Sequence, residues 1–79
     1  MTKPVKMNVY SWIDTATKSR CIIAANTKKE VGELCGRPES WVRNLRQTYD
    51  PYECDIARRM ENCTFRRPMH EPDAPFVQF

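Results

Sequence analysis

The sequence predicts one small α+β domain, in which an antiparallel sheet packs on three short helices in the order ββαααβ. Two observations lead to this fold class: two β-type segments follow one another near the start of the chain, and three helix-start signals come after them. A length of 79 residues suits a single domain with a modest core.

The predicted strands come from composition and alternation. Residues 8–13 and 20–25 are rich in β-branched and aromatic side chains, which favour strands. A short polar segment separates them, so we expect an antiparallel hairpin. Residues 63–66 alternate between polar and apolar types and are predicted to return to the hairpin as a third strand.

Capping signals place the first two helices. The first is predicted to begin after Thr27, whose hydroxyl can accept a hydrogen bond from the Glu30 amide while Glu30 reaches back. It ends at Gly36, because glycine takes the left-handed conformation without strain. Pro38 suits the first turn of a second helix, which is predicted to run to about Gln47.

The third helix is predicted to begin at Asp50, a good N-cap, followed by Pro51 in the first helical position. It should end near residues 61–62. Beyond it, three prolines within residues 68–79 exclude a regular helix. We therefore predict a domain covering residues 1–67 and a flexible, proline-rich tail covering 68–79.

Targeting signals are not expected in this chain. Residues 1–6 are interpreted as a loose leader, and no apolar run of the kind found in secretory signals follows them. The longest apolar run, residues 21–25, is far shorter than the ~20 residues of a membrane helix. We expect a cytoplasmic protein that has no membrane partner.

Charge is distributed unevenly along the chain, which has a net charge of +3. The predicted tail holds two of the 10 acidic residues and none of the 13 lysines and arginines, so the predicted domain carries +5. A mildly basic domain suits a nucleic acid or an acidic protein surface as its partner.

The cysteines fit no metal-binding pattern. There are four, and their spacing contains no Cys-x-x-Cys pair: Cys21, Cys35, Cys54 and Cys63. We expect free thiols, mostly on buried faces, with a zinc site that includes His70, or disulfides, as the alternatives.

Motifs for catalysis are not found either. His70 is the single histidine and lies in the predicted tail, and two glycines are too few for a phosphate-binding loop. The acids Asp50, Glu53 and Asp55 lie at a helix N-terminus, where the helix dipole favours them without any chemistry. We therefore expect no enzyme activity, no cofactor, no metal and no small-molecule substrate.

The most specific motif lies in residues 28–47. Gly32 stands where two helices can cross closely, Gly36 lies four residues later in a tight turn, and Val42 and Leu45 provide apolar anchors for the second helix. This pattern resembles the helix-turn-helix of bacterial and phage DNA-binding proteins.

The resemblance implies a regulator of transcription that places its second helix in the major groove of duplex DNA. Bases would be contacted by Ser40, Arg43, Asn44 and Gln47. Phosphates would be contacted by Lys28, Lys29, Arg37 and Arg46. A packed helix pair with a glycine turn is also a common way to build a core, so a purely structural use of the motif is the alternative.

A looser resemblance covers more of the chain. The aromatic first strand, the second strand ending in Ile-Ala-Ala-Asn and the helix start Thr-Lys-Lys-Glu resemble small accessory proteins of phages and prophages. This resemblance implies a second function: an inhibitor that binds a host protein such as RNA polymerase or a defence nuclease. The partner surface would then comprise Tyr10, Trp12, Arg58, Arg59, Arg66, Arg67, Phe76 and Phe79.

Two of these aromatic residues have an alternative role. Tyr10 and Trp12 lie on the same face of the first strand. They therefore either pack in the core or form an exposed platform for bases or for a protein.

Overall fold

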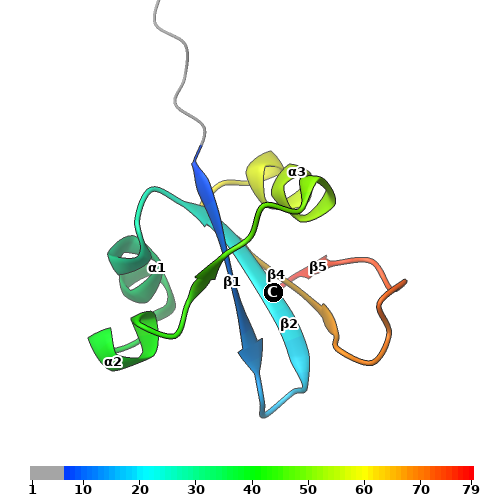
Figure 1. Ribbon diagram of the computed structural model, residues 1–79, viewed down its shortest axis with the longest axis horizontal. Helices are drawn as coiled ribbons and strands as arrows, with labels where there is room; N and C mark the ends of the chain where they lie inside the picture. Colours follow the sequence, from blue (N-terminus) through cyan, green and yellow to red (C-terminus); the bar gives the residue numbers. More distant parts are fainter. Residues whose placement is uncertain (1–6) are drawn as a thin grey trace, which may run out of the picture.

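The structure, a computed structural model, describes residues 7–79 and confirms the predicted α+β class (Figure 1). Five strands form an antiparallel sheet in the order β3-β1-β2-β4-β5. The elements are β1 (Asn8–Asp14), β2 (Ser19–Ala25), α1 (Lys28–Cys35), α2 (Glu39–Val42), β3 (Arg46–Gln47), α3 (Pro51–Arg59), β4 (Thr64–Pro68) and β5 (Val77–Gln78). The six predicted elements occur in the predicted order, and the two-residue strands β3 and β5 are additional.

The hairpin of β1 and β2 is the centre of the sheet. Its register runs from Asn8 opposite Ala25 to Asp14 opposite Ser19, and Lys18 takes a left-handed conformation in the turn (φ 53°). On the other side of β2, the strand β4 pairs antiparallel, with Ile22 opposite Phe65. The predicted hairpin and the predicted pairing of a third strand with it are therefore confirmed.

Thr27 and Gly36 delimit α1 as predicted, but only one of the two hydrogen bonds of the predicted capping box is formed between Thr27 and Glu30. The hydroxyl of Thr27 accepts a hydrogen bond from the Glu30 amide at 3.1 Å. At the other end, Gly36 adopts the left-handed conformation (φ 65°), and the amide of Arg37 donates to the carbonyl of Gly32 at 2.8 Å. This arrangement turns the chain sharply into α2.

The second helix is much shorter than predicted. We expected a helix over residues 38–47, but α2 ends at Val42, because the Asn44 and Leu45 amides bond to carbonyls only three residues back. The side chain of Leu45 then enters the core with 2% of its surface exposed. The next two residues, Arg46 and Gln47, pair with β1 as β3. Core packing and strand pairing thus end the helix after one turn.

The third helix begins as predicted and ends earlier. The carboxylate of Asp50 accepts a hydrogen bond from the Glu53 amide at 3.2 Å, and Pro51 occupies the first helical position. The helix ends at Arg59 instead of near residues 61–62, and Asn62 takes a left-handed conformation (φ 64°) before β4 begins.

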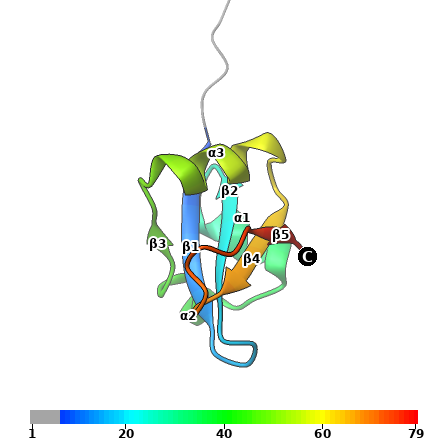
Figure 2. The same ribbon diagram turned by 90° about the vertical axis from the view of Figure 1, so that its right-hand side faces the viewer.

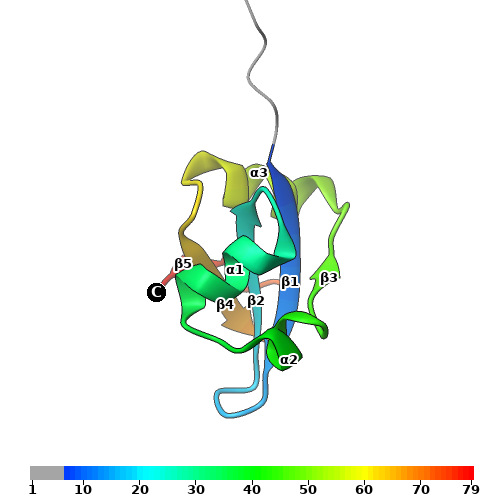
Figure 3. The same cartoon turned by 90° about the vertical axis from the view of Figure 1, so that its left-hand side faces the viewer.

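Helices cover both faces of the sheet, as Figures 2 and 3 show. On one face, α3 packs on a core cluster formed by Val9, Ile22, Ala24, Cys54, Ala57 and Phe65. On the opposite face, α1 and the chain after α2 pack on a second cluster formed by Tyr10, Ile23, Ala25, Val31 and Leu45. Because β2 lies between the two clusters, its residues 21–25 are completely buried and apolar throughout.

The segment predicted to be a separate tail belongs to the same layered structure. The strand β4 continues to Pro68, one residue past the predicted domain boundary at 67. The chain then crosses the face that α3 covers (Figure 2), where Phe76 packs against the core cluster of that face. Finally, Val77 and Gln78 pair with β4 as β5. Prolines prevent a helix in this segment, but they permit a short strand at the edge of a sheet.

The predicted leader, residues 1–6, lies outside the described residues.

The four cysteines are free thiols in this structure. Cys21 and Cys54 are buried, whereas Cys35 and Cys63 are half-buried. Burial raises the pKa of the Cys21 thiol to about 11. This environment keeps Cys21 protonated and unreactive near neutral pH.

Candidate interaction site

The helix pair α1–α2 encloses an open groove of about 670 Å³. Four of the eight residues predicted to bind DNA lie along it: Lys28, Lys29, Arg37 and Arg43. The acidic side chains of Glu33 and Glu39 line the same groove. The groove therefore has a positive but mixed charge.

The floor of the groove forms where the two helices meet. Gly32 is buried, and a Cβ atom at this position would overlap Cγ2 of Val42. This confirms the prediction that Gly32 permits a close crossing of the helices. The floor at this contact is apolar, because Gly32 and Val42 are the two lining residues of the groove that carry no charge.

The other four predicted DNA-binding residues, Ser40, Asn44, Arg46 and Gln47, do not line this groove. Asn44 donates its side-chain amide to the carbonyl of Ser40 at 3.4 Å. Gln47 lies on β3 and donates to the side chain of Asn8 at 3.1 Å, and Arg46 lies beside it in the same strand. The predicted base-reading set is therefore divided between α2 and the edge of the sheet.

The length of α2 also limits what it can read. Four residues of helix extend for about 6 Å. A recognition helix instead lies along a major groove that is about 12 Å wide and presents several side chains to it. Of the predicted base contacts, Ser40 and Arg43 remain at α2, and the Arg43 guanidinium lies 4.0 Å from the Glu39 carboxylate.

A second hollow, of about 310 Å³, lies on the same face of the sheet, beside the end of α1. We call it the aromatic hollow. It is lined by Trp12, Asp14, Leu34, Cys35, Arg37, Trp41, Thr64 and Phe79. Arg37 lines both this hollow and the α1–α2 groove, so the two are neighbours.

Aromatic and arginine side chains contact one another in and beside this hollow. The rings of Trp12 and Trp41 meet edge to face, with their centroids 5.3 Å apart. The guanidinium of Arg37 lies 5.7 Å from the centroid of the Trp41 ring, and that of Arg66 lies 4.9 Å from the centroid of Phe79. Such contacts hold side chains in place while leaving part of each exposed.

Three distant parts of the chain bring these side chains together. Trp12 comes from β1 and Trp41 from α2, and both are half-buried. Phe79 follows β5, and its carbonyl accepts a hydrogen bond from the Thr64 hydroxyl at 2.9 Å. Phe79 and Leu34 remain about half exposed, at 52% and 48%. The result is a surface of large apolar groups that water still reaches.

The eight predicted partner-binding residues are divided between the two faces of the sheet. Trp12 and Phe79 line the aromatic hollow, and Arg66 lies beside it over the Phe79 ring. Tyr10 is 5% exposed and belongs to the core, so its proposed role on an exposed platform is wrong. The reason is that α1 and Leu45 cover that part of β1, which the sequence could not show.

The remaining predicted partner residues lie on the α3 side of the molecule. Arg67 lies over the ring of Phe76 at 4.6 Å, and Tyr52 lies against the same ring. Arg58 donates to the carbonyl of Met7 at 2.9 Å, and Arg59 pairs with Asp55 along α3. These contacts hold neighbouring segments together on the face opposite the aromatic hollow.

Sequence reasoning missed the importance of Trp41 and of Leu34 for this site. Neither residue was among those predicted to bind DNA or a protein partner. Because α2 is a single turn, Trp41 lies at the margin of the helix layer, and Leu34 lies near the exposed end of α1. No local signal in the sequence distinguishes such a marginal position from a core position.

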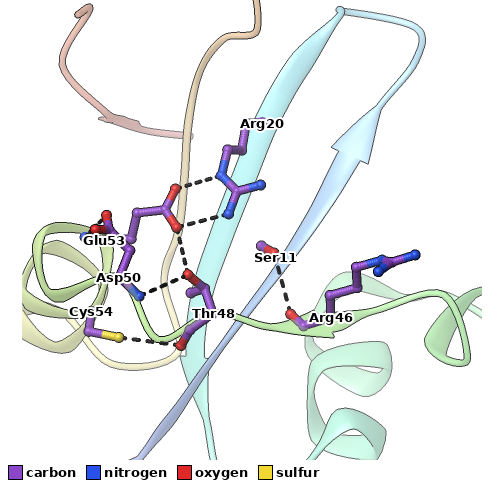
Figure 4. A network of polar contacts seen from close by, with 7 residues as sticks. All are labelled: Ser11, Arg20, Arg46, Thr48, Asp50, Glu53 and Cys54. Atoms are coloured by element: carbon purple, nitrogen blue, oxygen red, sulfur yellow. Dashed lines mark hydrogen bonds and ion pairs between the residues drawn. The ribbon is translucent and has the colours of Figure 1, made fainter. Parts of the chain in front are cut away.

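A buried polar network on the other face also escaped prediction (Figure 4). The carboxylate of Glu53, 3% exposed, accepts hydrogen bonds from the Arg20 guanidinium at 2.5 and 2.8 Å and from the Thr48 hydroxyl at 2.7 Å. The hydrogen bond from Arg20 holds the pKa of Glu53 below its usual value, against the effect of burial. This network fastens the start of α3 to β2 and is a structural element.

Every buried polar side-chain atom in residues 7–79 has a hydrogen-bond partner. Over the same residues, no three histidine, cysteine or acidic side chains come close enough together to hold a metal ion. His70 is exposed.

The helices of residues 7–79 are all too short or too polar to cross a membrane.

Comparison of the chain with models of known protein families, with curated proteins and with solved structures gave no match.

Proposed function

We propose that the protein is a non-catalytic binding module that recognises a protein partner through the aromatic hollow. The observation that supports this most directly is the half-buried pair of Trp12 and Trp41, flanked by Arg37 and by Phe79. Tryptophan and arginine are enriched among the residues that contribute most of the free energy of protein association.

The physical basis is that the surface is already arranged for binding. The edge-to-face contact holds Trp12 and Trp41 in place, so little side-chain freedom is lost when a partner covers them. Leu34 and Phe79 add apolar area that association would remove from water. Nearby cations, Arg37 and Arg66, can form hydrogen bonds at the rim of the interface.

Binding of duplex DNA is the second candidate. The gathering of Lys28, Lys29, Arg37 and Arg43 in one groove favours it, because these cations can contact phosphates. The short α2 and the carboxylates of Glu33 and Glu39 argue against the reading of bases by an inserted helix. Protein recognition is therefore placed first.

The test compares variants in affinity purification from cells of the source organism, with quantitative mass spectrometry. We expect Trp41→Ala to reduce recovery of the partner at least about tenfold, since truncating a central aromatic residue costs about 2 kcal/mol or more. Tyr49→Ala is the control, because Tyr49 is 78% exposed and lies outside the hollow. Melting curves would verify that both variants are folded.

Titration with duplex DNA from a randomised library, at about 150 mM salt, separates the two candidates. We expect no binding tighter than the ~10⁻⁴–10⁻⁶ M of non-specific contacts. Sequence-specific binding near 10⁻⁸ M, together with equal partner recovery for Trp41→Ala and the wild type, would place DNA first and contradict our proposal.

A further inference from the structure

The groove between α1 and α2 has a chemistry that specifies what binds there. We propose that it binds an acidic, amphipathic segment of the partner protein, whose carboxylates meet the basic rim and whose apolar side chain enters the floor. This rests on the proposed function, because the groove adjoins the aromatic hollow at Arg37 and extends the same surface.

The floor requires an apolar group. Gly32 has no side chain, and the close crossing leaves Val42 as the neighbouring surface, so polar atoms of a ligand would find no side-chain partner there. An apolar side chain fits this floor and would exclude water from it. A nucleic-acid backbone carries no such group.

The basic rim of the groove favours a ligand that places negative charges opposite its cations. Lys28 and Lys29 lie in the first turn of α1, where the helix dipole adds to the attraction for anions. Among the described residues, neither lysine forms an ion pair, and Arg37 forms none either. These cations are therefore available to carboxylates of a partner.

The two acids of the groove exclude a uniformly charged ligand. Glu33 and Glu39 face the same space as the cations, so a polyphosphate chain with one charge per nucleotide would meet like charges beside opposite ones. A peptide can place its carboxylates opposite the cations and neutral residues opposite the two acids. Mixed charge of this kind favours a protein segment over a nucleic acid.

The experiment is a selection of 16-residue peptides from a randomised displayed library on the full chain at about 150 mM salt. We expect the enriched peptides to carry net negative charge together with at least one large apolar residue. One enriched peptide is then synthesised and titrated into the wild type and the variants. Enrichment of basic or uncharged sequences, or no enrichment, would overturn the inference.

Arg43→Gln and Arg59→Gln form a matched pair, because each arginine is exposed at the C-terminal end of a short helix, beside an acid four residues earlier. They lie on opposite faces of the sheet. We expect Arg43→Gln and Lys28→Gln to weaken binding of the peptide roughly 2–5-fold, the range for exposed ion pairs, and Arg59→Gln to leave it unchanged. Equal effects of Arg43→Gln and Arg59→Gln would contradict the proposal.

Glu33→Gln tests the proposal by an expected increase in affinity for the peptide. A groove that does not bind the peptide would show no such increase. Removing this like charge should strengthen peptide binding roughly 2–3-fold. Unchanged or weaker binding would count against the proposal. A 15-base-pair duplex that bound more tightly than the peptide, and responded to the same substitutions, would assign the groove to nucleic acid instead.

The outcomes also separate this inference from the proposed function. If Trp41→Ala abolishes peptide binding while Arg43→Gln and Glu33→Gln have no effect, the aromatic hollow binds the partner and the groove does not. If none of the three substitutions has an effect, both proposals fail.

Discussion

At the scale of single residues, the most constrained position is Gly32. Glycine is needed here so that α1 and α2 can approach closely. The helical backbone at this position suits any residue, but Val42 fills the space that a Cβ atom would occupy. Without this contact, α2 could not lie against α1, and the groove would lose its floor. Local helix propensity alone would favour alanine at this site.

We predict that Gly32→Ala lowers the free energy of unfolding by about 1–3 kcal/mol, because overpacking outweighs the gain of about 1 kcal/mol in helix propensity. Val42→Ala in the same chain should recover most of this loss, and a double-mutant cycle in urea measures the coupling. A Gly32→Ala variant as stable as the wild type would show that the helices can separate freely.

Glu53 is the second residue with an individual role. Its ionised form is held by the Arg20 guanidinium, which lowers its pKa in the folded state relative to the unfolded chain. The stabilisation is therefore complete above the unfolded pKa of about 4.3 and disappears as pH falls through the lower folded pKa.

We predict that Glu53→Gln lowers stability at pH 7 by about 2 kcal/mol, less than for a fully buried pair, because Arg20 retains contact with water. The wild type should also lose more stability than this variant between about pH 4.5 and pH 3, since it alone binds the extra proton on unfolding. Urea midpoints measured across this range test both statements, and parallel pH profiles would contradict them.

At the scale of elements, the strands differ in how many neighbouring strands they pair with and in how deeply they are buried. The central strand β2 pairs on both sides and is buried on both faces, whereas β5 pairs over two residues on one side only. The amide of Phe79, which donates to the carbonyl of Thr64 at 3.1 Å, marks the end of that pairing. Local opening of β5 therefore breaks few contacts.

Hydrogen exchange followed by NMR should show this difference. We predict that amides of residues 21–24 exchange only through global unfolding, while those of Val77 and Phe79 exchange through local opening at a lower free energy. Protection of Phe79 equal to that of β2 would mean that β5 unfolds together with the rest of the sheet.

At the scale of the whole molecule, the domain includes residues beyond the predicted boundary at 67. Phe76 packs on the core of the α3 face and contacts Tyr52 and Arg67, and β5 closes one edge of the sheet. The same segment places Phe79 at the aromatic hollow on the opposite face. The last residues therefore connect the two layers.

We predict that a chain ending at Pro68 loses about 2 kcal/mol of stability, through lost apolar burial, and melts roughly 8–16 °C lower than the full chain. Phe76→Ala in the full chain should account for most of this decrease. Thermal unfolding measures both. An unchanged melting temperature for the shortened chain would show that residues 69–79 add nothing to the domain.

Features that depend on neighbouring residues could be predicted from the amino-acid sequence. The alternation of side chains in β1 and β2, the caps Thr27 and Asp50 and the left-handed Gly36 all act within a few residues, so their patterns predicted the elements correctly. The crossing at Gly32 was also predicted, because a motif of fixed spacing specifies it.

Long-range contacts set the extent of α2, the added strands β3 and β5, the Arg20–Glu53 pair and the meeting of Trp12 with Trp41. Each of these depends on groups that lie far apart in the chain: Trp12 of β1 meets Trp41 of α2, and Glu53 of α3 pairs with Arg20 of β2. Helix propensity favoured a longer α2, but the burial of Leu45 and the pairing of β3 with β1 outweighed it. Local preferences amount to fractions of a kcal/mol per residue, whereas burial of one large apolar side chain contributes about 1.5–3 kcal/mol, so packing sets the boundaries that the sequence leaves open.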